Sequence, residues 1–146
     1  MRVVCDTAPI VAATDRRDPA HHFAASLLRQ LGRQVHIPDP VIAETDALLR
    51  RRVGTESARM FLATISRGEH QVMFLSPGIV RRATHIDARY ADLNLGFTDA
   101  VVMAFAERHD LPILTFDFRD FRATAPERGD WRLVVDESRY LDATRG

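Results

Sequence analysis

The sequence contains no lysine: all 20 of its basic residues are arginine. This absence excludes mechanisms that need a lysine, among them the Walker A phosphate loop and Schiff-base chemistry. A compositional bias toward arginine is the simple explanation. Arginine is nevertheless well suited to bidentate contacts with phosphate groups, so the bias does not argue against a polyanionic ligand.

Cysteine, net charge and long apolar runs are also scarce. The single cysteine, Cys5, cannot form an internal disulfide, and its place in a short apolar segment predicts a small core residue. Because 20 acidic residues balance the 20 basic ones, a polyanion would have to be held locally. No apolar run approaches the roughly 18 residues of a membrane span, and the chain enters a strand without a signal-peptide pattern. We therefore expect a soluble, cytoplasmic protein without membrane association.

Short apolar segments alternate with segments of helical periodicity. A length of 146 residues favours a single domain, 1–146. Strands are expected at 3–5, 35–37, 71–75, 112–115 and 131–135. Helices are expected at 8–14, 21–31, 41–53, 56–68, 78–93 and 99–110, the last of them capped by Thr98. Strands separated by helices predict an α/β fold, with a parallel sheet of about five strands and helices on both faces.

Four acidic residues are expected at one edge of this sheet. Asp6 follows the first strand, and Asp117 follows the fourth. Asp99 begins the helix that leads into the fourth strand, and Glu44 lies along the apolar stripe of the helix that leaves the second strand. Loops and helix N-termini converge at the carboxyl ends of parallel strands, where ligands collect, so the four acids can meet in one pocket.

Each acid also has a purely structural explanation. A carboxylate in the first turn of a helix stabilises it by roughly 0.3–1 kcal/mol through the helix dipole, which alone could account for Asp99 or Glu44. Asp120 competes with Asp117, because both lie in the FDFRDF segment and both suit a turn. We assign Asp120 to the turn and Asp117 to the pocket. The four acids together are stronger evidence for a site than any one of them.

Such a pocket requires a cation or protonation. Two carboxylates about 4 Å apart repel by roughly 4 kcal/mol at an effective dielectric constant near 20. Oxygen ligands favour hard cations, Mg²⁺ or Mn²⁺, which are typical of phosphoryl chemistry, and the six scattered histidines do not suggest zinc. Arginines at 50–52 and 81–82 could hold a polyanionic backbone. We expect Arg119 and Arg122, beside Asp117, to contribute most.

Four segments in this order resemble the PIN-domain ribonucleases, and among them the VapC-type toxins of bacterial toxin–antitoxin pairs. The segments are DTAPIVA, PDPVIAE, FTDAVVMAFA and LTFDFRDF, and the resemblance covers almost the whole chain. It implies a three-layer α/β/α sandwich, homodimerisation and cleavage of RNA with Mg²⁺ or Mn²⁺. It also implies inhibition by a cognate antitoxin whose tail reaches the active site.

The resemblance also assigns roles to residues. It implies that Asp6, Glu44, Asp99 and Asp117 form the catalytic acidic site, with Thr115 as the hydroxyl residue that precedes the last acid. Asp6 and Asp99 are expected to be the principal metal ligands. Asp117 is expected to be a further metal ligand and, with Glu44, to complete the charge and position a second metal or the water.

Three functions remain open at this point. The leading hypothesis is a metal-dependent endoribonuclease, a hydrolase of phosphodiester bonds that acts as the toxin of a type II pair. The nearest alternative is a PIN nuclease that processes RNA without being a toxin. The third is a degenerate PIN fold that binds RNA or protein without cutting. Ala8 leaves room for this third function, because family members often carry Ser or Asn at that position.

Overall fold

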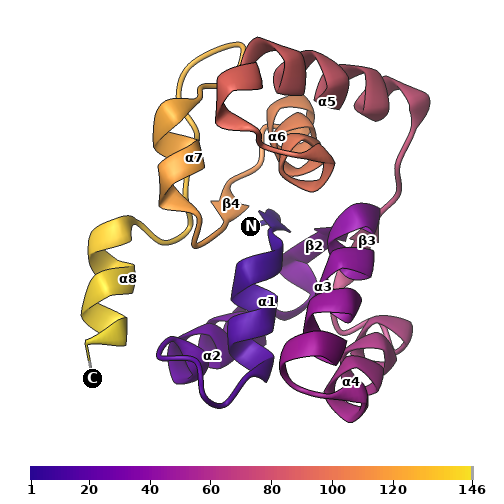
Figure 1. Ribbon diagram of the computed structural model, residues 1–146, viewed down its shortest axis with the longest axis vertical. Coiled ribbons are helices and arrows are strands. Elements are labelled where there is room, and N and C mark those ends of the chain that lie inside the picture. Colours follow the sequence, from indigo (N-terminus) through magenta and orange to yellow (C-terminus); the bar gives the residue numbers. More distant parts are fainter. Residues whose placement is uncertain (146) are drawn as a thin grey trace.

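The computed structural model describes residues 1–145 (Figure 1). In chain order the elements are β1 (Val3–Cys5), α1 (Thr7–Thr14), α2 (His21–Leu31), η1 (Gly32–Gln34), β2 (Val35–Pro38), α3 (Asp39–Arg52), α4 (Thr55–Ser66), β3 (Gln71–Met73), α5 (Pro77–Arg89), η2 (Ala91–Leu93), α6 (Phe97–His109), β4 (Ile113–Leu114), α7 (Phe118–Ala123) and α8 (Glu137–Thr144). The alternation of short apolar strands with helices confirms the predicted α/β class.

The sheet is parallel and has four strands in the order β3-β2-β1-β4. Val3 pairs with Val35 of β2, and Val4 pairs with Ile113 of β4. The predicted fifth strand, 131–135, forms only an isolated parallel bridge between Ile113 and Leu133. Its chain bonds to Ile113 alone and then turns into the start of α8, so no ladder of hydrogen bonds can develop.

Helices cover both faces of the sheet. Figure 1 shows α1 to α4 on one side of the strands and α5 and α6 on the other, as the expected three-layer sandwich requires. The chain moves from β1 outward to β2 and β3 through the first group, and it returns to β4, on the far side of β1, through the second. The connections of the neighbouring strands β1 and β4 therefore lie on opposite faces. Their carboxyl ends form the switch point at which open parallel sheets bind ligands.

Helix α6 is buried on every side. All residues from Ala100 to Ala106 are buried, and the helix packs against both β1 and α5. A helix that is apolar all round belongs in a protein interior, which explains why this segment carries so few charges. The predicted cap at Thr98 is wrong by two residues, because the helix begins at Phe97 after Gly96. Gly96 has a φ of 86°, a conformation that favours glycine.

Two helices near the C-terminus were not expected. The FDFRDF segment, predicted as a loop, forms the short helix α7, whose Phe118 and Phe121 are buried. Helix α8 follows the isolated bridge, and its Tyr140 packs against Phe116, with ring centroids 4.6 Å apart. Six-residue and eight-residue helices repeat the helical period only once or twice, so periodicity gives little warning of them.

The core lies on both sides of the sheet. Strands β1, β2 and β4 contribute fully buried side chains, including Cys5, which confirms the prediction of a core cysteine. Within residues 1–145, each helix is too short or too polar to cross a lipid bilayer.

Candidate active site

Asp6 lies at the switch point, where β1 gives way to α1. It caps α1: the backbone N–H of Thr7 donates to Asp6 Oδ1 at 2.8 Å. From the end of β4, Thr115 Oγ1 donates to Asp6 Oδ2 at 2.9 Å and accepts from the N–H of Asp117 at 3.0 Å. The carboxylate is only 5% exposed. These hydrogen bonds fix its orientation and tie together the first strand and the last.

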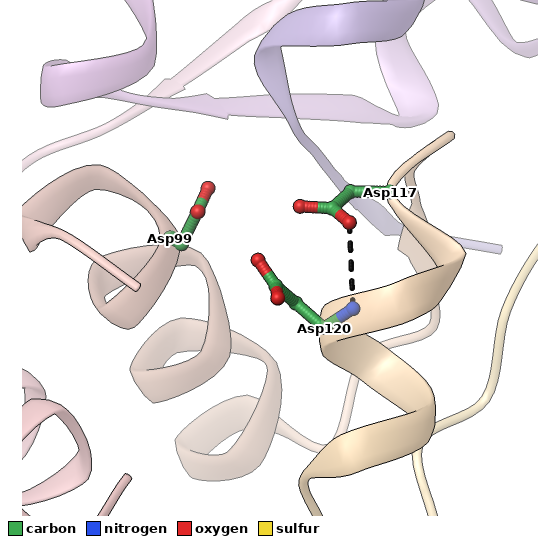
Figure 2. Close-up of side chains that lie close together, drawn as sticks. All are labelled: Asp99, Asp117 and Asp120. Atoms are coloured by element: carbon green, nitrogen blue, oxygen red, sulfur yellow. Dashed lines mark hydrogen bonds between the residues drawn. The ribbon is translucent and has the colours of Figure 1, made fainter. Parts of the chain in front are cut away.

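Asp99 and Asp117 face each other from α6 and α7 (Figure 2). Asp117 caps α7 by accepting from the N–H of Asp120 at 3.4 Å. One carboxylate oxygen from each of Asp99, Asp117 and Asp120 lies within 4.8 Å of the other two. The assignment of Asp120 to a turn is therefore wrong. Phe118 and Phe121 are buried, and Asp120 in the first turn of α7 lies beside Asp99 and Asp117.

One cavity of about 280 Å³ receives all four predicted acids. Asp6 is at its buried end, and Glu44 of α3 is exposed at its rim. The lining residues are Asp6, Thr7, Ala8, Val11, Asp18, Glu44, Leu48, Arg52, Asp99 and Asp117. The structure thus brings together side chains from four segments that are far apart in the sequence.

Crowding and burial raise the proton affinity of these acids. Burial, followed by the charges of Asp6 and Asp117, raises the pKa of Asp99 to about 8. Burial also raises the pKa of Asp6, against the hydrogen bonds from Thr7 and Thr115. The pKa of Asp120 is raised to about 6 by burial and by its neighbour Asp117. Without a cation, Asp99 therefore retains its proton at pH 7.

The donor set fits a hard divalent cation. The three closest carboxylates, those of Asp99, Asp117 and Asp120, can each offer one oxygen to a shared ion. Asp6 and Glu44 add further carboxylates on the same cavity. Ligands that are all oxygen suit Mg²⁺ or Mn²⁺ better than softer metals. A dication would offset the repulsion that now raises the pKa of Asp99.

Thr7 is a polar group in this cavity that the sequence did not single out. Its residue is only 6% exposed, and its hydroxyl has no hydrogen-bond partner within residues 1–145. A buried hydroxyl without a partner is costly unless a ligand or water completes it. The neighbouring Ala8, where a polar side chain was expected from the resemblance, is exposed on the same cavity. Threonine after an acid is too common a pattern to have revealed this position.

The arginines of the site also differ from expectation. Arg119 and Arg122 do not line the cavity, and Arg122 instead pairs with Glu137 of α8. The pairing follows from α8, which the sequence did not predict. Arg52, at the end of α3, lines the cavity in their place. Its position was visible only as one of three consecutive arginines.

Two sequence comparisons match most of the chain. A model of the PIN domain matches residues 3–126. The chain is 27% identical over 134 residues to Ribonuclease VapC26 of Mycobacterium tuberculosis (strain ATCC 25618 / H37Rv), a match that covers 91% of this chain and 99% of that protein.

Solved structures share the fold. The crystal structure of Mycobacterium tuberculosis VapC20, described as a sarcin-ricin loop cleaving toxin, superposes with a TM-score of 0.75 at 24% identity, covering 83% of this chain and 93% of that one. VapBC2 from Rickettsia felis, bound to a DNA fragment from its promoter, gives a TM-score of 0.62 at 16% identity over 84% of this chain and 92% of that one.

Proposed function

The chain belongs to the PIN-domain family, and we propose that it is an endoribonuclease that requires Mg²⁺ or Mn²⁺ and acts as the toxin of a type II toxin–antitoxin pair. One observation carries the proposal: acids from four separate segments line a single cavity at the switch point of the sheet. The similarity to a ribonuclease along nearly its whole length supports RNA as the substrate.

The four acids would divide the work between them. Asp6, Asp99 and Asp117 would hold the cation, with Asp120 close enough to join them, and Glu44 would complete the charge at the rim. A divalent cation bound there would activate water and balance the charge that develops on the phosphorus. Asp6 is held in place by Thr7 and Thr115, so it offers a preformed anchor.

Asp99 would act as the proton-exchanging member of the site. Its pKa of about 8 means that it carries a proton at pH 7 when no cation is present. It gives up this proton when the site is loaded, so cation affinity should rise with pH. The hydroxyl of Thr7, buried and without a partner, can donate to a water or to the substrate in the same cavity.

Partners follow from the same proposal. A cognate antitoxin would inhibit the enzyme, as one structural neighbour suggests: a toxin–antitoxin complex from Klebsiella pneumoniae, with a TM-score of 0.61 at 22% identity over 82% of this chain and 89% of that one. We also expect a homodimer that works in the cytoplasm on RNA. These expectations rest on the family to which the chain belongs.

Substitution of Asp99 by Asn tests the function. It keeps the shape of the side chain but removes the charge, so we expect RNA cleavage to fall by roughly 100-fold or more while the fold is retained. Cleavage of total RNA is measured with Mg²⁺ and Mn²⁺, and Mn²⁺ binding is measured by calorimetry. Asp87→Asn, an exposed acid on α5, is the matched control and should change neither quantity.

The outcomes separate the three functions. Full cleavage by the Asp99→Asn variant would refute the site. An RNA-processing nuclease would be favoured if the wild type cuts RNA but its expression does not arrest growth. It would also be favoured if growth arrest occurs and no protein encoded by an adjacent gene relieves it. RNA binding without cleavage and without Mn²⁺ binding would favour a binding module.

A further inference from the structure

One stripe of helix α3 runs along the wall of the acidic cavity. Glu44, Leu48 and Arg52 all line the cavity, and they follow one another at intervals of four residues. Residues four apart lie on the same face of a helix, and each residue advances about 1.5 Å, so Arg52 lies roughly 12 Å beyond Glu44 along the helix axis. The cavity is therefore a trough with different chemistry at its two ends.

Arg52 is the basic residue among those that line the trough. Its neighbours in the run are placed differently: Arg50 donates to both carboxylate oxygens of Asp46, at 3.1 and 3.0 Å, and Arg51 is exposed away from the cavity. Within the described chain, the guanidinium of Arg52 takes part in no ion pair. It is available for an external anion.

The end of the trough is fastened to the loop that follows α1. Arg17 Nη2 donates to the backbone oxygen of Arg52 at 2.6 Å, which fastens the end of α3 to the loop after α1. Asp18, from the same loop, also lines the cavity, but its Oδ1 accepts from the N–H of Ala20 at 2.8 Å. Asp18 thus stabilises the loop, and within residues 1–145 it forms no ion pair with Arg52.

Between the two ends the wall is apolar. Leu48 of α3 and Val11 of α1 line the trough between the acids and Arg52. Sugars and bases can contact such a surface, whereas phosphates cannot. The trough therefore has acids for a cation at one end, an apolar middle and a free guanidinium at the other end. This order matches the alternating chemistry of a nucleic-acid strand.

We propose that Arg52 binds a backbone phosphate of the RNA, upstream or downstream of the phosphate that is cut, while Leu48 and Val11 contact the nucleotides between. A stacked strand advances roughly 3.4 Å per nucleotide, and an extended strand advances further, so 12 Å corresponds to about two to four nucleotides from the cut. This subsite rests on the proposed ribonuclease function. It would set where the strand lies relative to the acids and hence which bond is cut.

Arg51, the neighbour of Arg52 on helix α3, is a matched control for a simpler role of Arg52, the stabilisation of the helix. Arginines in the last turn of a helix stabilise it through the helix dipole, and Arg51 and Arg52 share that position. Only Arg52 lines the trough. A dipole effect therefore predicts equal results for Arg51→Ala and Arg52→Ala, whereas a phosphate subsite predicts different ones.

RNA affinity is measured first, in proteins that also carry Asp99→Asn so that the RNA stays intact. The probe is a fluorescein-labelled single-stranded RNA of roughly 12 nucleotides, titrated at several salt concentrations. We expect Arg52→Ala to weaken binding about 10-fold and to reduce the slope of log affinity against log salt by about 0.7. Arg51→Ala should weaken binding less than about 2-fold, and Arg52→Lys should retain the salt slope.

The position of the contact is measured second, in an RNA that the wild type cuts. Neutral methylphosphonate linkages replace single phosphates on either side of the cut. We expect one position, about two to four nucleotides from the cut, at which the replacement weakens RNA binding by the protein that retains Arg52. The same replacement should not weaken RNA binding by the Arg52→Ala variant.

Two results would overturn the subsite, and they are distinguishable. If the wild type cuts RNA but Arg52→Ala matches Arg51→Ala in affinity and salt slope, the subsite is wrong and the function stands. If the wild type neither cuts nor binds RNA, both the subsite and the proposed function are wrong.

Discussion

The two ends of helix α6 each carry a carboxylate, and the surroundings shift the pKa values of the two in opposite directions. At the C-terminal end, Arg82 of α5 donates to Glu107 through Nε at 2.6 Å and Nη2 at 3.0 Å, and the N–H of Glu127 adds a third hydrogen bond at 2.9 Å. Burial alone would raise the pKa of Glu107, but these contacts lower it. At the N-terminal end, eight residues earlier, the charges that act on the pKa of Asp99 are all those of other acids.

The difference shows which carboxylate the fold neutralises by itself. Glu107 has its counter-ion inside the chain, so its charge serves to join α5, α6 and the loop at Glu127. Asp99 has no ion-pair partner among residues 1–145, and its pKa of about 8 shows that ionising it is unfavourable. Since a buried charge is normally paired, an unpaired cluster of this kind supports the proposed cation. The comparison predicts opposite responses when each end is altered.

The largest effect on stability is expected from Arg82→Ala. It leaves Glu107 half-buried without its partner, so unfolding free energy should fall. Arg82 is 34% exposed, and solvent screening limits the loss to about 1–2 kcal/mol, measured by urea unfolding. Arg81→Ala, its exposed neighbour, is the control. Equal stability of the two variants would remove the contrast between the ends of α6.

The opposite response is expected from Asp99→Asn without divalent cations. The folded-state pKa of Asp99, about 8, lies above the ordinary aspartate value of 3.8, so its contribution to stability is fully present below about pH 4 and is lost as pH rises through 8. Wild-type stability should therefore fall across this range, and at pH 9 the variant should be more stable by on the order of 1 kcal/mol after screening. Added Mn²⁺ should stabilise the wild type more than the variant.

Denaturant unfolding between pH 4 and 9 checks this second expectation. Asp87→Asn serves again as the control and should follow the wild type. A wild type whose stability rises between pH 6 and 9 would contradict the assigned direction of the Asp99 shift.

The smallest effect is expected from Asp120→Asn. It removes one of the charges that raise the pKa of Asp99, so the pKa of Asp99 should fall by less than about one pH unit. The carboxyl carbon of Asp99, followed by NMR during a pH titration, reports the midpoint. The control is Asp130→Asn, an exposed acid in the loop before the isolated bridge. An unchanged midpoint would place Asp120 outside the electrostatic cluster.

The sequence by itself determined the class of fold and the edge of the sheet at which the four acids lie. Short apolar strands followed by acids, at Asp6 and near Asp117, specify a parallel sheet and the edge at which its functional groups collect, because strand direction fixes which end each loop leaves. Asp99 and Glu44 could be placed at that edge by the same rule. Local patterns suffice where backbone geometry alone decides the outcome.

Only the tertiary structure decided which further residues lie at the site. Asp120 lies near Asp99 and Asp117 because the first turn of the short helix α7 places it there, and six residues of sequence cannot show this. Arg52 rather than Arg119 or Arg122 faces the trough, since the rotation of α3 about its axis is set by packing on the sheet and on α1. The sequence names residues along an element, whereas contacts between elements fix the direction in which each side chain points.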